Sequence, residues 1–485
     1  MKKINYKTAH IFIIIIGIFF VNLSIFHINL WFDESYSVGI SKHTFIDIWN
    51  IGGHDVHPVL YYWILHIIGL ITNNSILVYR LFSGLIIVIT GILGYTHIRK
   101  DFGEKVGLLF SFLIYFSPVT ALFANEIRMY ALAMLFITIL GIYAYRLSKN
   151  QKKSYWIIFF ISSLASIYTH YYSLMAAGII NLILLFYFIK KKNKKAYITQ
   201  IILGIIQAVL YLPWLIYFTS QLTTMHNNGF WISIKFPDTL IEILGYQFAG
   251  NLNMTIGLVI GVLIYAYCIY LIIKTKPKNN LPAILSLSVY LLVIIAAGVM
   301  SMVLGTHILY YRYLFVVTGL GFFAISFLFS NGKTVINVIL CSIILITGIF
   351  NQVSMIKENY DSSNHEAIDF IEENIEDGDV FIVSDLGAGT AISVNFFEYK
   401  HYFYNKSDWG VGEAYKAFGS DFETVINTDF IEECKTRTWI IVDVDSKFYE
   451  NCFNNENYEL LAHETFETKY KDYVFNLYLV DYIGE

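Results

Sequence analysis

The sequence is poor in charged residues and in cysteine. Only 14% of its 485 residues are Asp, Glu, Lys or Arg, whereas a soluble protein has about a quarter. Hydrophobic residues make up 56% of the chain. This composition excludes an ordinary soluble enzyme. Of the four cysteines, two lie in apolar stretches, where cysteine is a common packing residue.

Long apolar runs recur along the first 350 residues. Each is long enough to cross a hydrocarbon core of about 30 Å as a helix. The runs do not alternate apolar and polar residues, as the strands of a membrane barrel do ("IFIIIIGIFFVNLSIF"). The sequence therefore predicts a polytopic α-helical membrane protein with about eleven spans, at 9–29, 76–98, 106–123, 128–146, 155–170, 173–190, 197–218, 255–273, 282–303, 310–329 and 334–351.

The charges are distributed unevenly along the chain. Residues 1–350 hold 24 Lys and Arg against 9 Asp and Glu, whereas residues 351–485 hold 9 against 28. Placing the N-terminus in the cytoplasm puts 19 of the 24 basic residues on the inner side and five on the outer side. By the positive-inside rule this predicts a multi-pass protein of the plasma membrane, with a cytoplasmic N-terminus. Because the basic residues serve orientation, we expect no nucleic-acid partner.

Two domains follow from this topology. Residues 1–351 form the transmembrane domain, with a first outer loop at 30–75, and residues 352–485 form an extracytoplasmic soluble α/β domain. In the tail, "VFIVSD" and "TWIIVDVD" are typical of buried strands, and "NHEAIDFIEENIEDGD" of an amphipathic helix. Cys434 and Cys452 lie in this domain, where either a disulfide or two thiols is consistent with the sequence.

The first outer loop begins with adjacent acids, Asp33 and Glu34, in "WFDESYS". A carboxylate at the mouth of a span is costly, which points to function, although two solvated interface acids would be the structural alternative. One carboxylate can accept a proton while its neighbour holds substrate or raises the pKa of the pair.

Further along the loop, "HDVHP" supplies His54, Asp55 and His57. These residue types suit a divalent metal ion, hydrogen bonding to a substrate, or structural polar packing. If a metal is bound, its ligands would come from Asp33, His54, Asp55 and His57.

Further polar residues fall at the predicted outer ends of spans. Arginine presents a fork that matches a phosphate, so a lipid phosphate is one partner for Arg128; an ion pair with Glu126 is the alternative. Arg80 and Arg312 are candidates for a phosphate or for interface anchoring. The full set predicted to bind substrate is His54, Asp55, His57, Arg80, Glu126, Arg128, Tyr130, His170 and Arg312.

The motifs taken in order resemble a known family. "WFDESYS", "HPVLYYWILH", "YRLFSG", "FSPVTALFANEIRMYAL", "THYYSL", "YLPW" and "YYRYLF" together resemble integral-membrane glycosyltransferases of the GT-C superfamily. The similarity covers about residues 1–330 and is greatest to glycosyltransferase family 39, which includes protein O-mannosyltransferases and aminoarabinose transferases.

The resemblance implies a sugar donor carried on a polyprenyl phosphate and an active site at the outer face. It implies Asp33 as the catalytic base, with Glu34 beside it, and Arg128 as a ligand of the donor phosphate. The superfamily contains metal-dependent and metal-independent members, so a divalent metal ion stays an open possibility.

The predicted function is transfer of a hexose or pentose from a polyprenyl-phosphate donor to an acceptor hydroxyl, with inversion at the anomeric carbon. The expected partners are that donor, membrane lipids, and a lipid, glycan or protein acceptor. Two other classes are a transporter or flippase of lipid-linked sugars and a non-catalytic envelope assembly factor. A transporter would place polar residues near the bilayer midplane and would show related halves, and this sequence shows neither.

Overall fold

The computed structural model describes residues 5–229, 231–232, 238–275, 277–405 and 412–484. Residues 1–4, at the N-terminus predicted to be cytoplasmic, lie outside this part. The chain divides into two compact units. Unit 1 comprises Met1–Ile25 and Arg80–Ser354, and unit 2 comprises Phe26–Tyr79 and Met355–Glu485. The division differs from a single cut after residue 351, because residues 26–79 group with the C-terminal residues.

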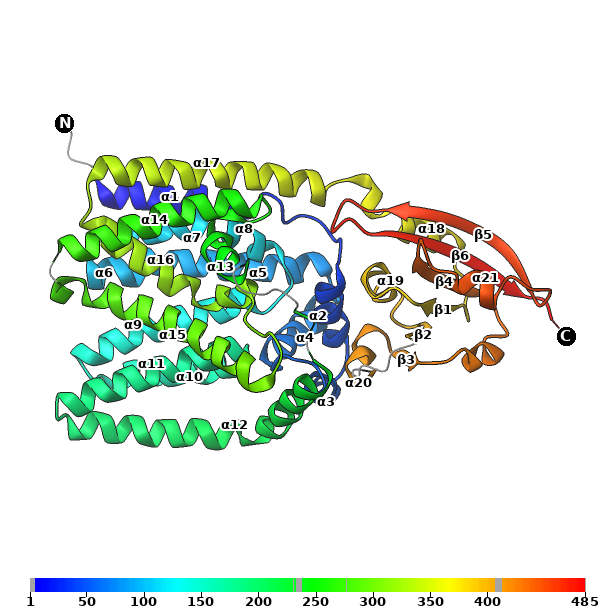
Figure 1. Ribbon diagram of the computed structural model, residues 1–485, viewed down its shortest axis with the longest axis horizontal. Helices are drawn as coiled ribbons and strands as arrows, with labels where there is room; N and C mark the ends of the chain where they lie inside the picture. The colour runs from blue at the N-terminus through cyan, green and yellow to red at the C-terminus, as the bar shows by residue number, and fades with distance from the viewer. Residues whose placement is uncertain (1–4, 230, 233–237, 276, 406–411, 485) are drawn as a thin grey trace. The chain divides into compact units, whose positions relative to one another are not determined.

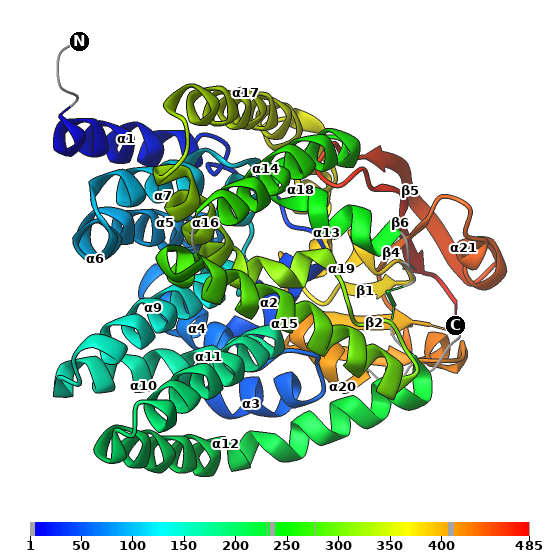
Figure 2. The ribbon, with the colours of Figure 1, turned by 60° about the vertical axis from the view of Figure 1, so that its left-hand side comes forward.

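Unit 1 is a bundle of helices (Figures 1 and 2). Both views show α10, α11 and α12 side by side. The helices that lie mainly in this unit are α1 (Tyr6–Val21), α5 (Ile76–Leu93), α6 (Arg99–Phe102), α7 (Glu104–Phe116), α8 (Pro118–Asn125), α9 (Tyr130–Lys149), α10 (Lys153–Ile167), α11 (Tyr171–Lys190), α12 (Lys194–Asn228), α13 (Asp238–Ala249), α14 (Met254–Lys274), α15 (Leu281–Leu304), α16 (Phe315–Ser330) and α17 (Thr334–Asn359).

Many of these helices are suited to a membrane. Within the described residues, eight helices are long and apolar enough to cross one, and the bent pair α7–α8 is a ninth if it forms one span. Helices α1 and α10 are apolar but shorter, with 16 and 15 residues. Each of the eleven predicted spans coincides with one of these helices or with the bent pair. The predicted polytopic α-helical fold is therefore confirmed.

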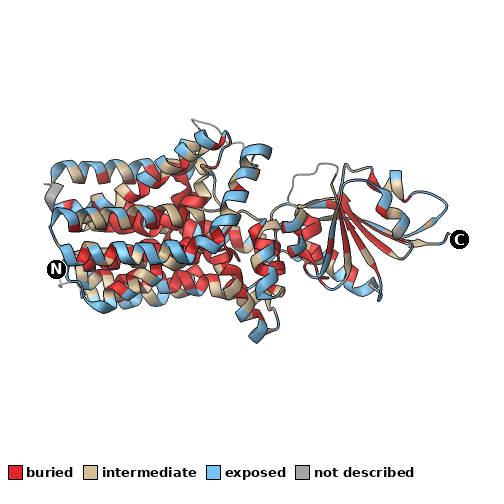
Figure 3. Cartoon of the chain, turned by 90° about the horizontal axis from the view of Figure 1, so that it is seen from below, coloured by how far each residue is buried: buried red, intermediate tan, exposed pale blue. Residues whose placement is uncertain are grey.

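The burial pattern separates helices of the bundle centre from helices of its surface (Figure 3). Helix α16 is buried along almost its whole length. By contrast, α12 exposes large apolar side chains such as Ile205 and Ile216. An apolar exposed face is what a lipid-facing helix requires, because hydrocarbon offers no partners for polar groups.

Unit 2 contains a six-stranded sheet in the order β3-β2-β1-β4-β6-β5. Strands β3, β2, β1 and β4 are parallel, and β6 and β5 extend the sheet as an antiparallel edge. Figure 3 shows the central strands buried. The strands are β1 (Val380–Val383), β2 (Lys400–Tyr404), β3 (Asp421–Val425), β4 (Thr438–Asp443), β5 (Tyr458–Glu467) and β6 (Val474–Tyr482).

The helices of unit 2 come from two separate parts of the chain. Residues 26–79 supply three of them, and the C-terminal residues supply the rest. They are α2 (Phe32–Lys42), α3 (Phe45–Gly53), α4 (Leu60–Thr72), α18 (Glu366–Asn374), α19 (Gly387–Ser393), α20 (Gly412–Tyr415) and α21 (Phe448–Cys452). The predicted strands β1 and β4 and the predicted helix α18 are all present.

Strand β1 leads into α19 through "SDLGAGTA". The Asp385 carboxylate accepts the backbone N–H groups of Gly387 (3.2 Å) and Ala388 (2.7 Å). A helix N-terminus attracts anions, and here a side chain of the protein occupies that position. Gly389 lets α19 approach the sheet, because a Cβ there would lie 2.1 Å from Cγ1 of Val383. The segment is thus a closely packed strand-to-helix turn.

One face of the sheet packs around Cys434, Phe430, Ile440 and Tyr478, and Cys452 packs against the same cluster. Between the aromatic rings of Phe381 and Phe422 the sheet buries His401 completely, with ring centroids 4.9 and 5.7 Å away. Burial lowers the pKa of His401 to about 4. Its imidazole is therefore neutral in the folded protein near pH 7.

His401 should make unit 2 sensitive to acid. In the unfolded chain this histidine titrates near 6.5, so the unfolded state binds more protons between pH 6.5 and 4. The contribution of His401 to stability is complete above pH 6.5 and is lost as the pH falls to 4, by about 3 kcal/mol in all.

Hydrogen exchange of the β1 and β2 amides, recorded at pH 7 and at pH 5, measures this loss of stability. We expect His401→Phe to reduce the pH dependence, and His463→Phe, at an exposed position of β5, to leave it unchanged. Equal pH dependence in wild type and His401→Phe would contradict this expectation.

Candidate active site

The acidic pair lies in the first turn of α2, within unit 2. The aligned peptide dipoles at a helix N-terminus favour negative charge, so the turn suits both carboxylates. The two side chains differ in exposure. Asp33 is half-buried, whereas Glu34 has no exposed surface. Of the two, Asp33 is the carboxylate with access to solvent or substrate.

Close packing fixes the position of α2. A Cβ on Gly39 would lie 2.2 Å from the backbone oxygen of Ala417, so only glycine permits this approach. The hydroxyl of Ser37 donates to the backbone oxygen of Asp33 (3.1 Å), one turn earlier in the helix. Helix α2 therefore packs closely at Gly39, and an additional hydrogen bond joins its first two turns.

Residues near the end of the chain contact the same turn of α2. The Tyr470 hydroxyl donates to Oε2 of Glu34 at 2.8 Å, and both side chains are buried. The Tyr473 hydroxyl accepts the backbone N–H of Phe32 at 3.2 Å. Burial raises the pKa of Tyr473 to about 12, and the carboxylates of Asp385, Asp33 and Glu34 add to the rise. Several negative charges therefore gather around this turn.

The segment after α3 brings His57 to Asp55. His57 is buried, and its Nδ1 lies 3.2 Å from Oδ2 of Asp55, which also accepts from the Tyr62 hydroxyl at 3.4 Å. Burial raises the pKa of Tyr415 to about 12, with a further rise from Asp55. His54 instead is exposed and bonds the backbone oxygen of Asn50 through Nδ1 (2.9 Å).

The four residues considered as metal ligands do not form a recognisable metal centre. Among the residues that the structure describes, no three His, Cys, Asp or Glu side chains are grouped so that they could hold one ion. Asp55 and His57 form a pair, and His54 is turned to its own helix. Asp55 and His57 therefore make polar contacts within the protein, together with Tyr62.

In unit 1, a helix break separates α7 from α8. The chain bends by 58° between the two helices, where Pro118 takes the first position of α8. Pro lacks an N–H donor and is well suited to that position. Arg80 is fully buried and donates to the backbone oxygen of Asn125, the last residue of α8. A cation there satisfies a carbonyl that the helix end leaves open.

Glu126 follows α8 directly and pairs with Arg312. The distance from Nη2 of Arg312 to Oε2 of Glu126 is 2.6 Å, and the side chains are 15% and 4% exposed. The Arg312 guanidinium also lies over the rings of Tyr130 (5.1 Å) and Phe123 (5.9 Å). Glu126 therefore forms an ion pair with Arg312, a partner that the sequence did not indicate.

Aromatic rings extend from this ion pair to the start of α11. The His170 ring lies 5.3 Å from that of Tyr130 and 5.4 Å from that of Tyr313. Nδ1 of His170 accepts the backbone N–H of Tyr172 (3.0 Å), which makes His170 the N-terminal cap of α11. Arg128 is also buried, in the short segment between α8 and α9. Unit 1 therefore brings Glu126, Arg312, Tyr130 and His170 into one cluster.

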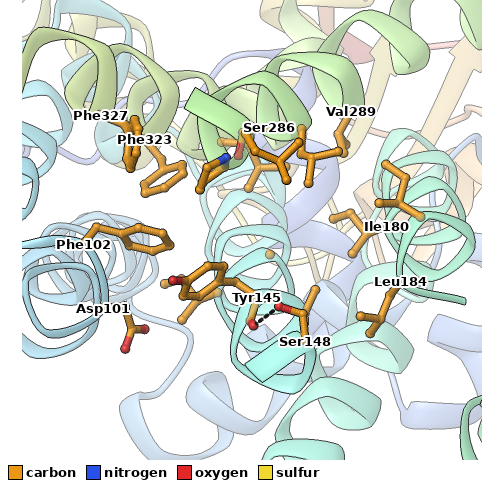
Figure 4. Close-up of a pocket in the computed structure, with 18 of the residues that line it drawn as sticks. Asp101, Phe102, Tyr145, Ser148, Ile180, Leu184, Ser286, Val289, Phe323 and Phe327 are labelled. Atoms are coloured by element: carbon orange, nitrogen blue, oxygen red, sulfur yellow. Dashed lines mark hydrogen bonds between the residues drawn. The ribbon is translucent and has the colours of Figure 1, made fainter. Parts of the chain in front are cut away.

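Unit 1 also has a cavity of about 580 Å³ (Figure 4). Its walls are mostly apolar, and Phe102, Tyr145, Ser286 and Phe323 point toward it. Of the α9 residues that line it, Thr138 is nearest in sequence to Tyr130, eight residues further on, or about 12 Å along the helix at 1.5 Å per residue. The cavity is distinct from the predicted site residues of this unit.

Sequence reasoning missed Tyr470 and Tyr473, which contact the acidic turn, and Tyr313, which joins the aromatic cluster. Tyr470 is 436 positions from Glu34, and the sequence around it, "TKYKDYV", contains no recognisable motif. Only the folding of unit 2 brings Tyr470 and Tyr473 to the acidic turn.

Comparisons with known proteins agree with the fold. Residues 56–217 match the family described as dolichyl-phosphate-mannose-protein mannosyltransferase. No curated protein matches the chain in sequence. The structure is similar to that of ArnT from Cupriavidus metallidurans in the apo state, with a TM-score of 0.62, 9% identity and coverage of 97% of each chain.

Two further solved structures are less similar. ArnT from Cupriavidus metallidurans bound to undecaprenyl phosphate has a TM-score of 0.49 and 10% identity, with 97% of each chain covered. The archaeal oligosaccharyltransferase AglB from Archaeoglobus fulgidus, in complex with an inhibitory peptide and a dolichol-phosphate, also has a TM-score of 0.49 and 10% identity. That match covers 91% of this chain and 70% of AglB.

The resemblance predicted from the motifs is thus supported over residues 56–217 by sequence and over nearly the whole chain by fold. The chain is a membrane protein with the fold of the GT-C glycosyltransferases.

Proposed function

We propose that this protein transfers a sugar from a polyprenyl-phosphate donor to an acceptor hydroxyl at the outer face of the plasma membrane. The observation that carries the proposal is the acidic turn of α2, where Asp33 is half-buried and its neighbour Glu34 is fully buried. In this pair Asp33 is the accessible carboxylate, and other negatively charged groups lie near it. The match of residues 56–217 to a dolichyl-phosphate-mannose-dependent family supports the donor class.

Asp33 acts as the general base. A second carboxylate nearby raises the pKa of an acid and so makes its ionised form more basic. Asp33 takes the proton of the acceptor hydroxyl while the acceptor oxygen bonds to C1 of the sugar. The bond from C1 to the phosphate oxygen breaks, and the polyprenyl phosphate leaves. A single displacement of this kind inverts the anomeric carbon.

The cationic residues of unit 1 bind the donor phosphate. Arg128 is buried in the short segment between α8 and α9, and an arginine fork binds phosphate in two contacts. Arg312 adds charge and is oriented by Glu126 and Tyr130. Arg80 holds the carbonyl end of α8 and so acts on the segment that follows it, which carries Glu126 and Arg128.

The remaining polar residues bind substrate hydroxyls. His57 and Asp55 are hydrogen-bonded to each other, and His54 is exposed next to them. His170, which caps α11 through Nδ1, lies in the aromatic cluster beside Tyr130 and Tyr313. The transferred sugar is a hexose or a pentose, and the acceptor is a lipid, a glycan or a protein.

The orientation is proposed from the distribution of basic residues. It places the C-terminal residues outside the cell and the lysine-rich turn between α11 and α12 inside. Asn427 and Lys191 are both exposed, so a cysteine introduced at either position is accessible to a reagent. With a membrane-impermeant maleimide on intact cells, Asn427→Cys should be labelled, and Lys191→Cys should be labelled only after permeabilisation. The unsubstituted protein gives the background from native cysteines. The reverse labelling pattern would contradict the orientation.

Analysis of the glycans of the cell envelope tests the function without knowledge of the sugar. Deletion of the gene should remove one sugar from one envelope component, and the wild-type gene should restore it. The Asp33→Asn gene should not restore it at equal protein level. An unchanged glycan profile after deletion, under conditions in which the protein is made, would count against the proposal.

A further inference from the structure

The turn that joins β5 to β6 has a specific internal structure. The strands end with the pair Glu467 and Val474, and the backbone N–H of Thr468 then donates to the oxygen of Tyr473 at 2.9 Å. The Thr468 hydroxyl donates to the oxygen of Tyr470 (3.1 Å) and accepts the N–H of Tyr473 (3.2 Å). The turn, residues 468–473, is therefore ordered by its own hydrogen bonds.

Two residues of the turn adopt a left-handed backbone. Lys471 has a φ of 66° and Asp472 a φ of 51°. Two consecutive residues of positive φ are typical of a hairpin turn of type I′, although glycine and asparagine are the usual residues there. The turn also makes a contact outside its own hairpin.

That contact is the first turn of α2. The Tyr470 hydroxyl donates to Glu34 at 2.8 Å, and the Tyr473 hydroxyl accepts the backbone N–H of Phe32 at 3.2 Å. In addition, Nζ of Lys471 lies 4.9 Å above the ring of Trp31. One hairpin turn thus contacts three of the first residues of "WFDES" through three different kinds of interaction.

The turn is anchored on its other side as well. The backbone N–H of Tyr470 donates to Oδ1 of Asn364 at 2.7 Å, and that of Lys471 to Oε1 of Glu358 at 3.4 Å. The Tyr470 ring lies 5.1 Å from the His27 ring. Tyr470 is therefore fixed at its backbone, its ring and its hydroxyl.

We propose that the 468–473 turn is part of the catalytic assembly, in which Tyr470 is a positioning residue for Glu34 and, through the first turn of α2, for Asp33. This role presupposes the proposed glycosyl transfer. A fully buried carboxylate requires a donor to stay ionised, and Tyr470 provides a hydroxyl donor to Glu34. Through the Glu34 side chain, Tyr470 therefore acts on the neighbour of Asp33. The C-terminal residues of unit 2 thereby take part in the reaction.

The pH profile distinguishes this role from simple structural support. The turn itself carries the titratable residues Lys469, Tyr470, Lys471, Asp472 and Tyr473, and those that face it include His27, Asp33, Glu34, Glu358 and Asp385. Without the Tyr470 hydroxyl, the protonated form of Glu34 is favoured, so the acidic pair takes up its first proton at a higher pH. The acid limb of the rate profile should then move to higher pH.

The experiment compares Tyr470→Phe with Tyr458→Phe in the purified full-length protein. Tyr458 is a matched control, since its hydroxyl donates to the backbone oxygens of Ile431 and Cys434 (both 3.3 Å) within the same sheet domain. For Tyr470→Phe we expect kcat to fall about tenfold or more, as for a lost hydrogen bond to a charged group, and the acid limb to rise by about one pH unit. Tyr458→Phe should keep both values. In a Glu34→Gln background, Tyr470→Phe should have no further effect on the acid limb.

Two further measurements keep the test decisive. Infrared titration of the carboxyl C=O band, assigned by its loss in Glu34→Gln, should show Glu34 protonating at higher pH in Tyr470→Phe than in wild type. If Tyr470→Phe does not fold, Tyr473→Phe replaces it, with an expected loss of kcat. Absence of transfer activity in the wild type would overturn the proposed function. The infrared titration alone would then decide whether Tyr470 acts on Glu34. Wild-type kcat, acid limb and infrared titration in folded Tyr470→Phe would overturn the role of the turn.

Discussion

Replacement of Asp33 by asparagine is expected to slow sugar transfer by ~10²–10⁴-fold, the usual contribution of a general base. Asparagine keeps the shape of the side chain in the first turn of α2 but has no useful basicity. Binding of the donor should persist, because the proposed phosphate ligands are the arginines of unit 1. The measurement is single-turnover transfer by purified Asp33→Asn protein, with donor affinity determined in parallel.

Two other acids serve as comparisons for Asp33. Glu34→Gln should impair transfer less, since Glu34 is fully buried and hydrogen-bonded to Tyr470. Asp47→Asn should retain activity, because Asp47 lies in the first turn of α3 and accepts from the Thr44 hydroxyl at 2.6 Å. Activity of Asp33→Asn above about a tenth of wild type would refute the assignment of the base. An inactive Glu34→Gln beside an active Asp33→Asn would move the base to Glu34.

Removal of the Glu126 carboxylate should destabilise unit 1 strongly. Glu126→Leu leaves the Arg312 guanidinium buried without its partner, and breaking a buried pair in this way costs about 3–5 kcal/mol. The double variant Glu126→Leu/Arg312→Met should regain most of that stability, since it removes both charges. Reversible unfolding in mixed detergent micelles measures the free energies.

The double variant also separates stability from function. If Arg312 binds the donor phosphate, the protein should be folded but should bind the donor poorly. Asp101→Asn is the control, because it disrupts a second ion pair of similar length, between Arg146 and Asp101 (2.7 Å). The Asp101 carboxylate is more exposed than that of Glu126, and Asp101 lines the cavity. It should cost less stability and leave donor binding unchanged. Normal donor affinity in the folded double variant would return Arg312 to a structural role.

The sequence predicted those features of the fold that depend on local composition. Long apolar runs could become only helices in a membrane, and all eleven coincide with helical segments. The β1 and β4 strands were recognisable because both lie at the centre of the sheet and are continuously apolar. The edge strand β5, mostly exposed and rich in glutamate, has no such signal. Its place was fixed only by pairing with β6.

The candidate site was predictable to the extent that its residues are unusual for their surroundings. Asp33 and Glu34 stood out because acids are rare beside an apolar span. The partners of these residues were not predictable, because hydrogen bonds such as that from Tyr470 to Glu34 join distant positions. Glu126 illustrates the same limit: the sequence offered the nearby Arg128 as a partner, and it gave no sign of the ion pair with Arg312, 186 positions away.

The central claim is that the donor is a sugar on a polyprenyl phosphate. Its most direct test is release of polyprenyl phosphate by the purified protein from synthetic polyprenyl-phosphate hexoses and pentoses, with envelope extract as the acceptor source. Nucleotide-activated forms of the same sugars are run in parallel. The account predicts that at least one lipid-linked sugar is consumed by wild type, that Asp33→Asn does not consume it, and that nucleotide sugars are untouched. Transfer from a nucleotide sugar, or equal release by wild type and Asp33→Asn, would contradict it.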